Sequence, residues 1–568
     1  MSAMNPCTPS MRELPGFTCR SGSSPYFSPG AENRHPAPWR EVRASRALPS
    51  PAKLGLLMLG LLFTGPSYAT EEIACIEFER VEVQANSLLD SSAASVLVSS
   101  LEGRCIDAQL IRDILSRFSA YFVEQGYVTT RPYLLEQDIS DGEIDIAVLV
   151  GFIEAIVDAD SGSSNASISG AFAFNNRVLN LRELETSLEA IERPQSVQAS
   201  FEIRPGTRQG GSIVAVKSEK SIPFHIEIGA NARTDFDPQV SLRATLDNPL
   251  NTNDILVFRY NSGDLFQAYQ SDRSRELDYS VAFGSYLLSL IHSDITYKQR
   301  LQGFSGSLVA EGESVSDQLR LGKLLGRGQN YRVNLGIGLE LEDSRNLFEG
   351  EVIDVSSYKT SKAEIELRHD WYASWGQLLT RYTHQQGLDS FGARDDSFFN
   401  AVDGFDDEAR LQFKKHTLEG QLLYYLTNPD WSFQLKFHGQ YSNDLLFNAD
   451  KLVLGSESTV RGYTYALSGS NGWYARSDLV KRLQSVTNPF SGSPLTKYIT
   501  LSLGIDYGEI RCEADNPDLC GDIYGLGAGI AIVDDNFSGL LSWGHPLKEL
   551  DDDIGSEDVF LLDLRWSL

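Results

Sequence analysis

The chain has few cysteines and few histidines, and it lacks the common catalytic motifs. Among its 568 residues six are cysteine and eight are histidine, and the histidines are scattered singly. No His-Glu-x-x-His, Gly-x-Ser-x-Gly or Walker-type phosphate loop is present. The sequence therefore predicts neither an enzyme nor a metal site or other bound cofactor.

Clusters of lysine and arginine are also lacking. The chain has 49 Lys and Arg against 77 Asp and Glu, which gives a formal net charge of −28. Because contacts with phosphate groups need clustered positive side chains, this balance argues against nucleic acid as a partner.

Long hydrophobic runs are absent, and the single continuous one covers residues 54–63. It is too short to cross a bilayer as a helix. Lys53 and several arginines precede it, and Ser67, Tyr68 and Ala69 follow. This order is typical of a secretory signal peptide, so we expect residues 1–69 to be leader and signal peptide, with a signal anchor as the alternative.

The cysteines support export. Cys7 and Cys19 fall in the leader, and an even number remains in the mature chain. An even number in an exported protein predicts disulfides, each closing within its own region of the chain. The candidates are Cys75 with Cys105, and Cys512 with Cys520.

The first region after the leader has the pattern of a small α/β module. Residues 76–83 alternate apolar and polar side chains, as a half-buried strand does. Asp107 can cap a helix that Gly126 would end. Its apolar face would comprise Ile111, Ile114, Leu115, Phe118 and Phe122. Further strands are expected at residues 134–137 and 144–150, and the module is bounded at 71–156.

A second module, bounded at 157–220, repeats this logic. Asn180 followed by Glu183 resembles a capping box, and Leu181, Leu184, Leu188 and Ile191 share one face. Pro194 ends the helix after Arg193. Strands are expected at residues 199–204 and 212–217.

Residues 221–568 are strand after strand. In residues 225–233, Ile226, Ile228, Ala230 and Ala232 would face one side and the polar residues the other. Short connections alternate with long polar ones, as in transmembrane β-barrels, whose strands need about 9–11 residues to cross. In residues 559–568 an apolar face ends in Trp566 and Leu568.

The strand count is a separate prediction. A first count gives an odd number, which would put the two ends of a barrel on opposite sides of a membrane. Treating residues 303–312 as part of one long hairpin gives eleven strands before Ser458 and five after it. We therefore expect a sixteen-stranded barrel.

Residues 458–478 form a loop rich in Gly, Ser and Tyr, with Arg461 near its start. The stretch Val460, Arg461, Gly462, Tyr463, with a later S-G-x-x-G-W-Y, resembles the conserved sixth-loop motif of two-partner secretion transporters. These are the haemolysin and filamentous-haemagglutinin secretion/activation proteins, of the ShlB/FhaC/HecB type.

The two α/β modules resemble the paired POTRA domains of the same family. The first carries G-Y-V-T at 126–129 and G-F-I-E at 151–154, with Phe152 where the family usually has arginine. The second carries L-N-L-R-E-L-E at 179–185 and P-G…G-G-S at 205–212. Family members commonly have an N-terminal plug helix; residues 71–76 leave no room for one, so we expect none.

The resemblance implies a mainly β fold: a 16-stranded transmembrane β-barrel in residues 221–568, preceded by two small periplasmic α/β POTRA domains. It also implies that the loop at 443–473 folds into the barrel, where Arg461 meets a carboxylate on the inner wall. The matching strand carries Gly504, Ile505 and Asp506, with Gly504 in place of the family's aromatic residue. Asp506 is then the lumen partner of Arg461.

The resemblance further implies a translocator of the Gram-negative outer membrane. Its POTRA domains would bind an unfolded, haemolysin- or adhesin-like partner protein in the periplasm, and its barrel would export that partner. Further partners would be outer-membrane lipid and the barrel assembly machinery, and the protein would be a monomer without a cofactor. The alternatives are an outer-membrane assembly factor of the same superfamily and a passive porin.

Overall fold

We describe the protein from a computed structural model. The described residues are 75–83, 88–89, 91–173, 178–234, 236–263, 271–303, 306–397, 409–428, 430–464, 466–483, 498–513, 519–550 and 557–568. The expected signal peptide lies outside them. The expected absence of a plug helix concerns residues 71–76, which also fall largely outside this part of the chain.

The chain divides into two compact units that meet between Gly151 and Phe152. The first unit contains a three-stranded sheet in the order β1-β3-β2, with β1 parallel and β2 antiparallel to β3. Cys75 and Cys105 are joined by a disulfide in this unit. Its elements are β1 (Arg80–Val83), α1 (Ser91–Val98), η2 (Ser99–Leu101), α2 (Ala108–Glu124), β2 (Arg131–Leu134) and β3 (Glu143–Leu149).

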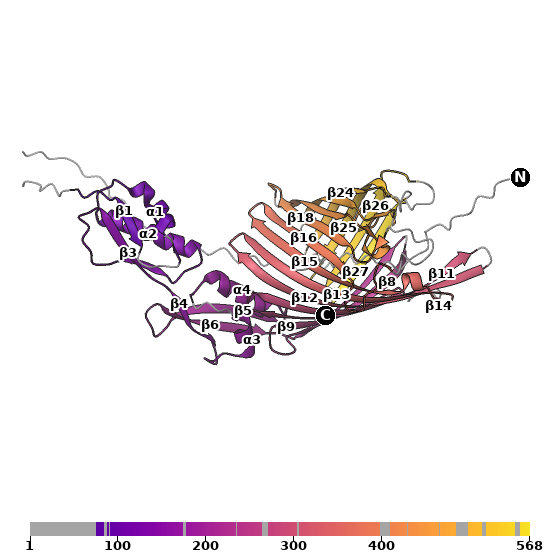
Figure 1. Ribbon diagram of the computed structural model, residues 1–568, viewed down its shortest axis with the longest axis horizontal. Helices are drawn as coiled ribbons and strands as arrows, with labels where there is room; N and C mark the ends of the chain where they lie inside the picture. Colours follow the sequence, from indigo (N-terminus) through magenta and orange to yellow (C-terminus); the bar gives the residue numbers. More distant parts are fainter. Residues whose placement is uncertain are drawn as a thin grey trace, which may run out of the picture. The chain divides into compact units, whose positions relative to one another are not determined.

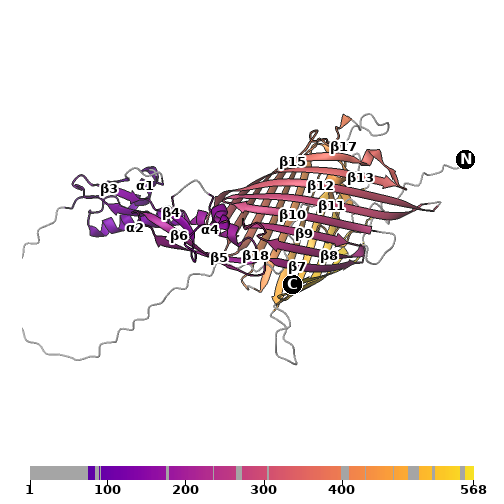
Figure 2. The same ribbon diagram turned by 90° about the horizontal axis from the view of Figure 1, so that it is seen from below.

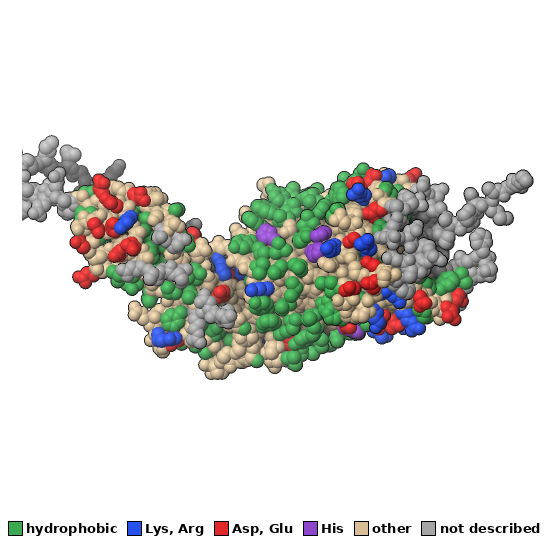
Figure 3. Space-filling model, viewed as in Figure 1, with side chains coloured by type: hydrophobic (Ala, Val, Ile, Leu, Met, Phe, Trp, Pro, Cys, Tyr) green, Lys and Arg blue, Asp and Glu red, His purple; other side chains and the backbone are tan. Residues whose placement is uncertain are grey.

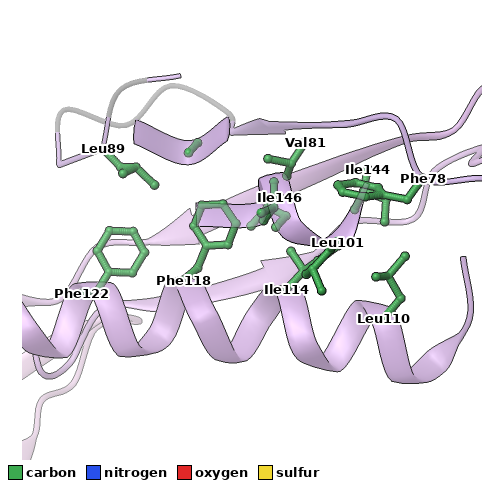
Figure 4. Close-up of a cluster of buried hydrophobic side chains, with 12 residues drawn as sticks. Phe78, Val81, Leu89, Leu101, Leu110, Ile114, Phe118, Phe122, Ile144 and Ile146 are labelled. Atoms are coloured by element: carbon green, nitrogen blue, oxygen red, sulfur yellow. The ribbon is translucent and has the colours of Figure 1, made fainter. Parts of the chain in front are cut away.

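Helix α2 supplies most of the first unit's core. The Asp107 side chain accepts a hydrogen bond from the backbone N–H of Leu110 (2.7 Å), as an N-cap does, and Gly126 follows the helix with a φ of +91°. One face of α2 points at the sheet (Figure 4). The cap and the apolar face predicted from the sequence are therefore confirmed. The fully buried residues of that face are Leu110, Ile114, Phe118 and Phe122.

The second module has a sheet in the order β4-β6-β5, in which β4 is parallel to β6. The carboxylate of Glu154 on β4 accepts hydrogen bonds from Thr207 and from the backbone N–H of Arg208, and these bonds hold the pKa of Glu154 below its usual value. Arg208 lies over the ring of Phe152, 4.8 Å from its centre. The elements are β4 (Phe152–Asp158), α3 (Ala166–Ala171), α4 (Leu181–Glu192), β5 (Val197–Pro205) and β6 (Gly211–Lys220).

Two boundaries expected from the sequence are wrong. The module boundary expected at 156/157 lies at 151/152, because β4 pairs with β6 of the second sheet. The strand expected at 134–137 is β2 at 131–134. The side chain of Gln137 bonds both the N–H and the carbonyl of Asp145 on β3, so an amide replaces the backbone pairing there. The short helices α1 and α3 were not expected.

The rest of the chain forms a closed barrel, in which β27 pairs with β7. Figures 1 and 2 show its strands side by side, with β11 and β12 extended at one end. Sixteen strands of nine or more residues make up the described barrel, as predicted. They are β7 (Phe224–Arg233), β8 (Phe236–Asp247), β9 (Asp254–Ser262), β10 (Ser271–Phe283), β11 (Tyr286–Gly303), β12 (Gly306–Arg327), β13 (Tyr331–Phe348), β15 (Tyr358–Ala373), β16 (Gly376–Leu388), β18 (Lys414–Tyr425), β19 (Trp431–Ser442), β23 (Gly472–Leu483), β24 (Tyr498–Ile510), β25 (Gly521–Val533), β26 (Phe537–Pro546) and β27 (Val559–Ser567).

Both ends of the barrel chain lie together. The backbone of Leu568 exchanges hydrogen bonds with that of Ile226 at the start of β7, as an even strand number requires. Short additional elements lie between the long strands, and Cys512 and Cys520 are joined by a disulfide between β24 and β25. The short elements are β14 (Glu351–Val352), η3 (Asp354–Ser356) and β17 (Ala409–Arg410).

The outer surface of the barrel is apolar. Figure 3 shows hydrophobic side chains gathered over the middle of the barrel and charged ones near the end that carries the long hairpin. On β24, Leu503 and Ile505 are 57% and 59% exposed, whereas the next residue, Asp506, is fully buried. A band of apolar side chains on the outer surface, with polar side chains inside, is typical of a barrel that is surrounded by the hydrocarbon of a membrane. No helix in the described residues is long and apolar enough to cross a membrane.

The second module is joined to turns at the end of the barrel where β7 begins. Glu189 on α4 pairs with Arg327 (2.8 Å) and Arg332 (2.5 Å). At the end of the same helix, Arg193 donates to the carbonyl of Ser280 on β10 (3.2 Å). Charged and backbone contacts therefore fix α4 against the barrel.

Candidate functional site

The segment between β19 and β23, residues 443–471, folds into the barrel. Its hairpin pairs β21 with β22 in antiparallel register, and its tip comprises residues 455–466. Leu454 and Val460 are fully buried and pack against Ile510 and Ile523 on the inner face of β24 and β25. The short elements of the segment are β20 (Leu445–Leu446), η4 (Asn448–Asp450), β21 (Leu452–Leu454) and β22 (Leu467–Gly469).

Arg461 at the tip of this segment forms a two-pronged ion pair with Asp506. Its Nε lies 2.7 Å from Oδ2 and its Nη2 lies 2.7 Å from Oδ1, and its backbone N–H also donates to Oδ2 (3.1 Å). The Arg461 side chain is 2% exposed and that of Asp506 is fully buried. This geometry satisfies a buried guanidinium with a charge-assisted pair.

A second carboxylate, which the sequence reasoning missed, completes the environment of the guanidinium. Asp478 on β23 accepts from Nη1 of Arg461 (2.8 Å) and from Nε of Arg476 (3.2 Å). Arg476 also donates to the backbone carbonyl of Glu457, on the inward segment. The alternation of β23 places Tyr474, Arg476 and Asp478 on one face, which marks Asp478 as an inward carboxylate but does not show that it meets Arg461.

The residues of the barrel wall that contact Arg461 include three glycines. A Cβ on Gly504 would lie 2.4 Å from Nη2 of Arg461, and one on Gly527 would lie 2.1 Å from its Cζ. A Cβ on Gly525 would lie 2.2 Å from the Arg461 carbonyl oxygen. Gly504, which replaces the family's aromatic residue, therefore leaves the space that the guanidinium fills.

The neighbours of Arg461 fix the tip of the segment. Gly462 has a φ of +84°, and a Cβ there would lie 2.3 Å from the backbone of His545, so glycine is needed at this position. The hydroxyl of Tyr463 lies 2.8 Å from the carbonyl oxygens of Tyr524 and Lys548. The structure thus brings the Val460–Tyr463 motif, Gly504 and Asp506 together at one place on the inner wall.

The described residues hold no group of three or more His, Cys, Asp or Glu side chains that could bind a metal ion. The chemistry of the site is that of a buried, balanced ion cluster. Such a cluster can hold a segment in place and can release it when the pairing is broken.

Comparisons with known proteins agree with this arrangement. Residues 210–532 match the family profile of the haemolysin secretion/activation proteins ShlB/FhaC/HecB, and residues 76–151 match the ShlB-type POTRA domain. The chain is 24% identical to the outer membrane transporter CdiB of Dickeya dadantii, over 84% of this chain and 83% of that protein. It is 28% identical to the hemolysin transporter protein ShlB of Serratia marcescens, over 78% and 77% of the two chains.

A solved structure shares the fold. CdiB from Escherichia coli superposes with a TM-score of 0.78 at 23% identity, covering 89% of this chain and 93% of that one.

Proposed function

Because the chain belongs to the ShlB/FhaC/HecB family of haemolysin secretion/activation proteins, we propose that it exports a partner protein across the outer membrane. Several of its relatives are named outer membrane transporters or hemolysin transporters. The observation that carries the proposal is the segment inside the barrel, which is held by the buried pair of Arg461 and Asp506. A passive porin needs neither this pair nor the modules that precede the barrel.

The POTRA modules face the periplasm and bind the client there in an extended state. In the first unit β2 lies at the edge of the described sheet, and Tyr133 and Leu134 on it are 46% and 36% exposed. An extended client segment can add to such an edge through backbone hydrogen bonds and place alternate side chains on the exposed apolar residues. In the second module β5 offers a similar edge.

The finer parts of the proposal concern energy and assembly. The protein acts as a monomer without catalysis or a cofactor, and binding and outside folding of the client supply the driving force. The barrel assembly machinery inserts it, guided by the apolar face of β27. That face comprises Phe560, Leu562, Leu564 and Trp566, each at least 37% exposed.

The test is secretion by a variant that lacks residues 75–151, so that Cys75 is removed together with its disulfide partner Cys105. This deletion removes the first unit alone and keeps the second module, whose α4 is bound to the barrel turns. We expect a folded barrel, seen as heat-modifiable electrophoretic mobility, and no client in the medium. The client to supply is a secreted haemolysin- or adhesin-like partner protein.

Two results would contradict the proposal. Secretion at the normal rate by the deletion variant would place client recognition elsewhere. A loss of other outer-membrane barrels on depletion of the full-length protein, with secretion unchanged, would instead identify an assembly factor.

A further inference from the structure

A second buried ion cluster holds the inward segment, on strands away from Arg461. Asp450 ends the short helix η4 within the segment, and it is 8% exposed. Its Oδ1 lies 3.0 Å from Nζ of Lys362 on β15 and 3.2 Å from Nζ of Lys415 on β18. The Lys362 and Lys415 side chains are 8% and 12% exposed, so both ammonium groups are largely buried.

Contacts with the backbone of Asp450 and with an aromatic ring add to this cluster. The Asp450 carbonyl oxygen accepts from Nζ of Lys415 (3.2 Å) and from the side-chain amide of Gln440 on β19 (3.1 Å). Three residues before Asp450, the ring of Phe447 contacts that of Tyr358 on β15, with centres 5.7 Å apart. The start of the segment is therefore bound to β15, β18 and β19, whereas its tip is bound to β23, β24 and β25.

The two clusters have opposite polarity. At the tip the segment contributes a cation, Arg461, and the wall contributes carboxylates. At Asp450 the segment contributes a carboxylate and the wall contributes two cations, one of which also lies 3.8 Å from Glu342 on β13. A segment rotated or shifted in the barrel would bring like charges together, which is costly where water is excluded.

We propose that Asp450, with Lys362 and Lys415, is a second anchor that positions the inward segment and must be broken before the barrel can pass its client. This inference rests on the proposed export function. The Asp450 cluster uses strands β15 and β18 of the wall, whereas the Arg461 cluster uses β23 and β24. We therefore expect the two clusters to contribute separately.

The test measures access to the segment without any client. Lys451 follows Asp450 directly, so trypsin added from outside reports release of the segment by cleavage after Lys451. Asp450→Asn removes the carboxylate that the two buried ammonium groups share, and it leaves Lys362 with Glu342 of β13, 3.8 Å away. We expect cleavage about tenfold faster than in the wild type. Asp450→Glu keeps the carboxylate and should restore slow cleavage.

The matched control is Asp343→Asn. It removes the same kind of partner from Lys359, which lies 3.0 Å away on β15, but these side chains are 56% and 60% exposed. Exposed pairs contribute little, so cleavage should stay at the wild-type rate. Equal rates for Asp450→Asn and Asp343→Asn, with the barrel folded in both, would overturn the proposal.

Independence of the two anchors is tested by combining variants. In Asp450→Asn with Arg461→Ala the fold-increases in cleavage after Lys451 should multiply, because each substitution breaks a different cluster. A combined effect no larger than that of one substitution would show a single cooperative unit and would contradict a second anchor.

If the Asp450→Asn variant lacks heat-modifiable mobility, its barrel has not folded. The single variants Lys362→Met and Lys415→Met are then used in its place. Each leaves the other lysine paired with Asp450, so we expect about threefold faster cleavage. Wild-type rates in both would overturn the proposal. Because cleavage is read without client, a failure here is distinct from a failure of secretion in the proposed function.

Discussion

The first unit and the barrel differ in whether they bury charged side chains. In the described residues of the first unit no charged side chain is buried, and the core residues Ile114 and Phe118 are at most 1% exposed. In the barrel, Arg461 and Asp506 are buried at 2% and 0%, while Ile505 next to Asp506 is 59% exposed. At this part of the barrel wall the apolar side chain faces outward and the charged ones are buried, which is the reverse of the first unit.

The surroundings explain this reversal. Water around the first unit favours burial of apolar area, whereas hydrocarbon around a barrel accepts apolar side chains and leaves the polar ones to the interior. The first unit is therefore stabilised by packing against α2. The inward segment of the barrel is held by buried paired charges as well as by apolar packing, so loss of one charged partner has a large effect.

The largest effect is expected from breaking the pair of Arg461 and Asp506. Arg461→Ala leaves the buried carboxylate of Asp506 without its cation, and Asp506→Ala leaves the guanidinium with Asp478 alone. Breaking the buried pair in either way should weaken the holding of the segment by about 3–5 kcal/mol. We expect secretion to fall sharply while heat-modifiable mobility persists. Arg461→Lys should rescue poorly, since an ammonium group cannot make the two-pronged contact with the carboxylate.

The double variant Arg461→Ala with Asp506→Ala separates a pair from two unrelated effects. Its secretion should be little worse than that of either single variant, because the second substitution removes a charge that the first has already stranded. Asp478 stays in place and keeps its contact with Arg476. Additive losses, or near-normal secretion by Asp506→Ala, would show that the two residues do not act together.

Sequence reasoning reached the parts of this site that repeat a pattern. The alternation of β24 put Asp506 inside, and the family motif around Arg461 pointed to it as the partner. It missed Asp478, since a strand with several inward polar residues does not show which one meets the segment. The close contact of Gly525 and Gly527 with Arg461 was also missed. A glycine in a strand has no side chain, so the sequence does not show which residue packs against it.

The fold shows the same limit. Strand number and the apolar face of α2 follow from periodicity, which is local in the chain. The boundary between the modules does not, since the pattern of β4 is the same whichever sheet it joins. The second anchor at Asp450 also depends on lysines 88 and 35 residues away in sequence, which no local pattern connects.

Isoleucine-to-alanine substitutions at Ile114 and Ile505 compare a buried position in the first unit with an outward-facing position on the barrel. Ile114→Ala opens a cavity in the first unit and should cost about 2–5 kcal/mol of its free energy of unfolding, measured on the isolated unit by thermal melting. Ile505→Ala opens no cavity, because Ile505 is largely exposed on the outer face of β24. The temperature at which the barrel loses its heat-modifiable mobility should therefore change little.

A charged side chain at position 505 should, unlike alanine, lower the unfolding temperature of the barrel. Ile505→Lys places an ammonium group against hydrocarbon, at a cost of about 2–4 kcal/mol near the middle of the bilayer. A drop in the barrel's unfolding temperature for Ile505→Ala as large as that for Ile505→Lys would contradict the assignment of this face to lipid.

The smallest expected effect lies at the start of α2, in the region that depends on packing. The Asp107 carboxylate accepts from the N–H of Leu110, which would otherwise have no partner within the first turn of the helix. Asp107→Ala should lower the free energy of unfolding of the first unit by about 0.5–2 kcal/mol, and Asp107→Asn, which can still cap, by less. Thermal melting of the isolated unit with its disulfide intact measures both. Because the apolar core beneath the helix is unchanged, neither variant should lose cooperativity; a loss as large as that of Ile114→Ala would mean that Asp107 holds more than the end of the helix.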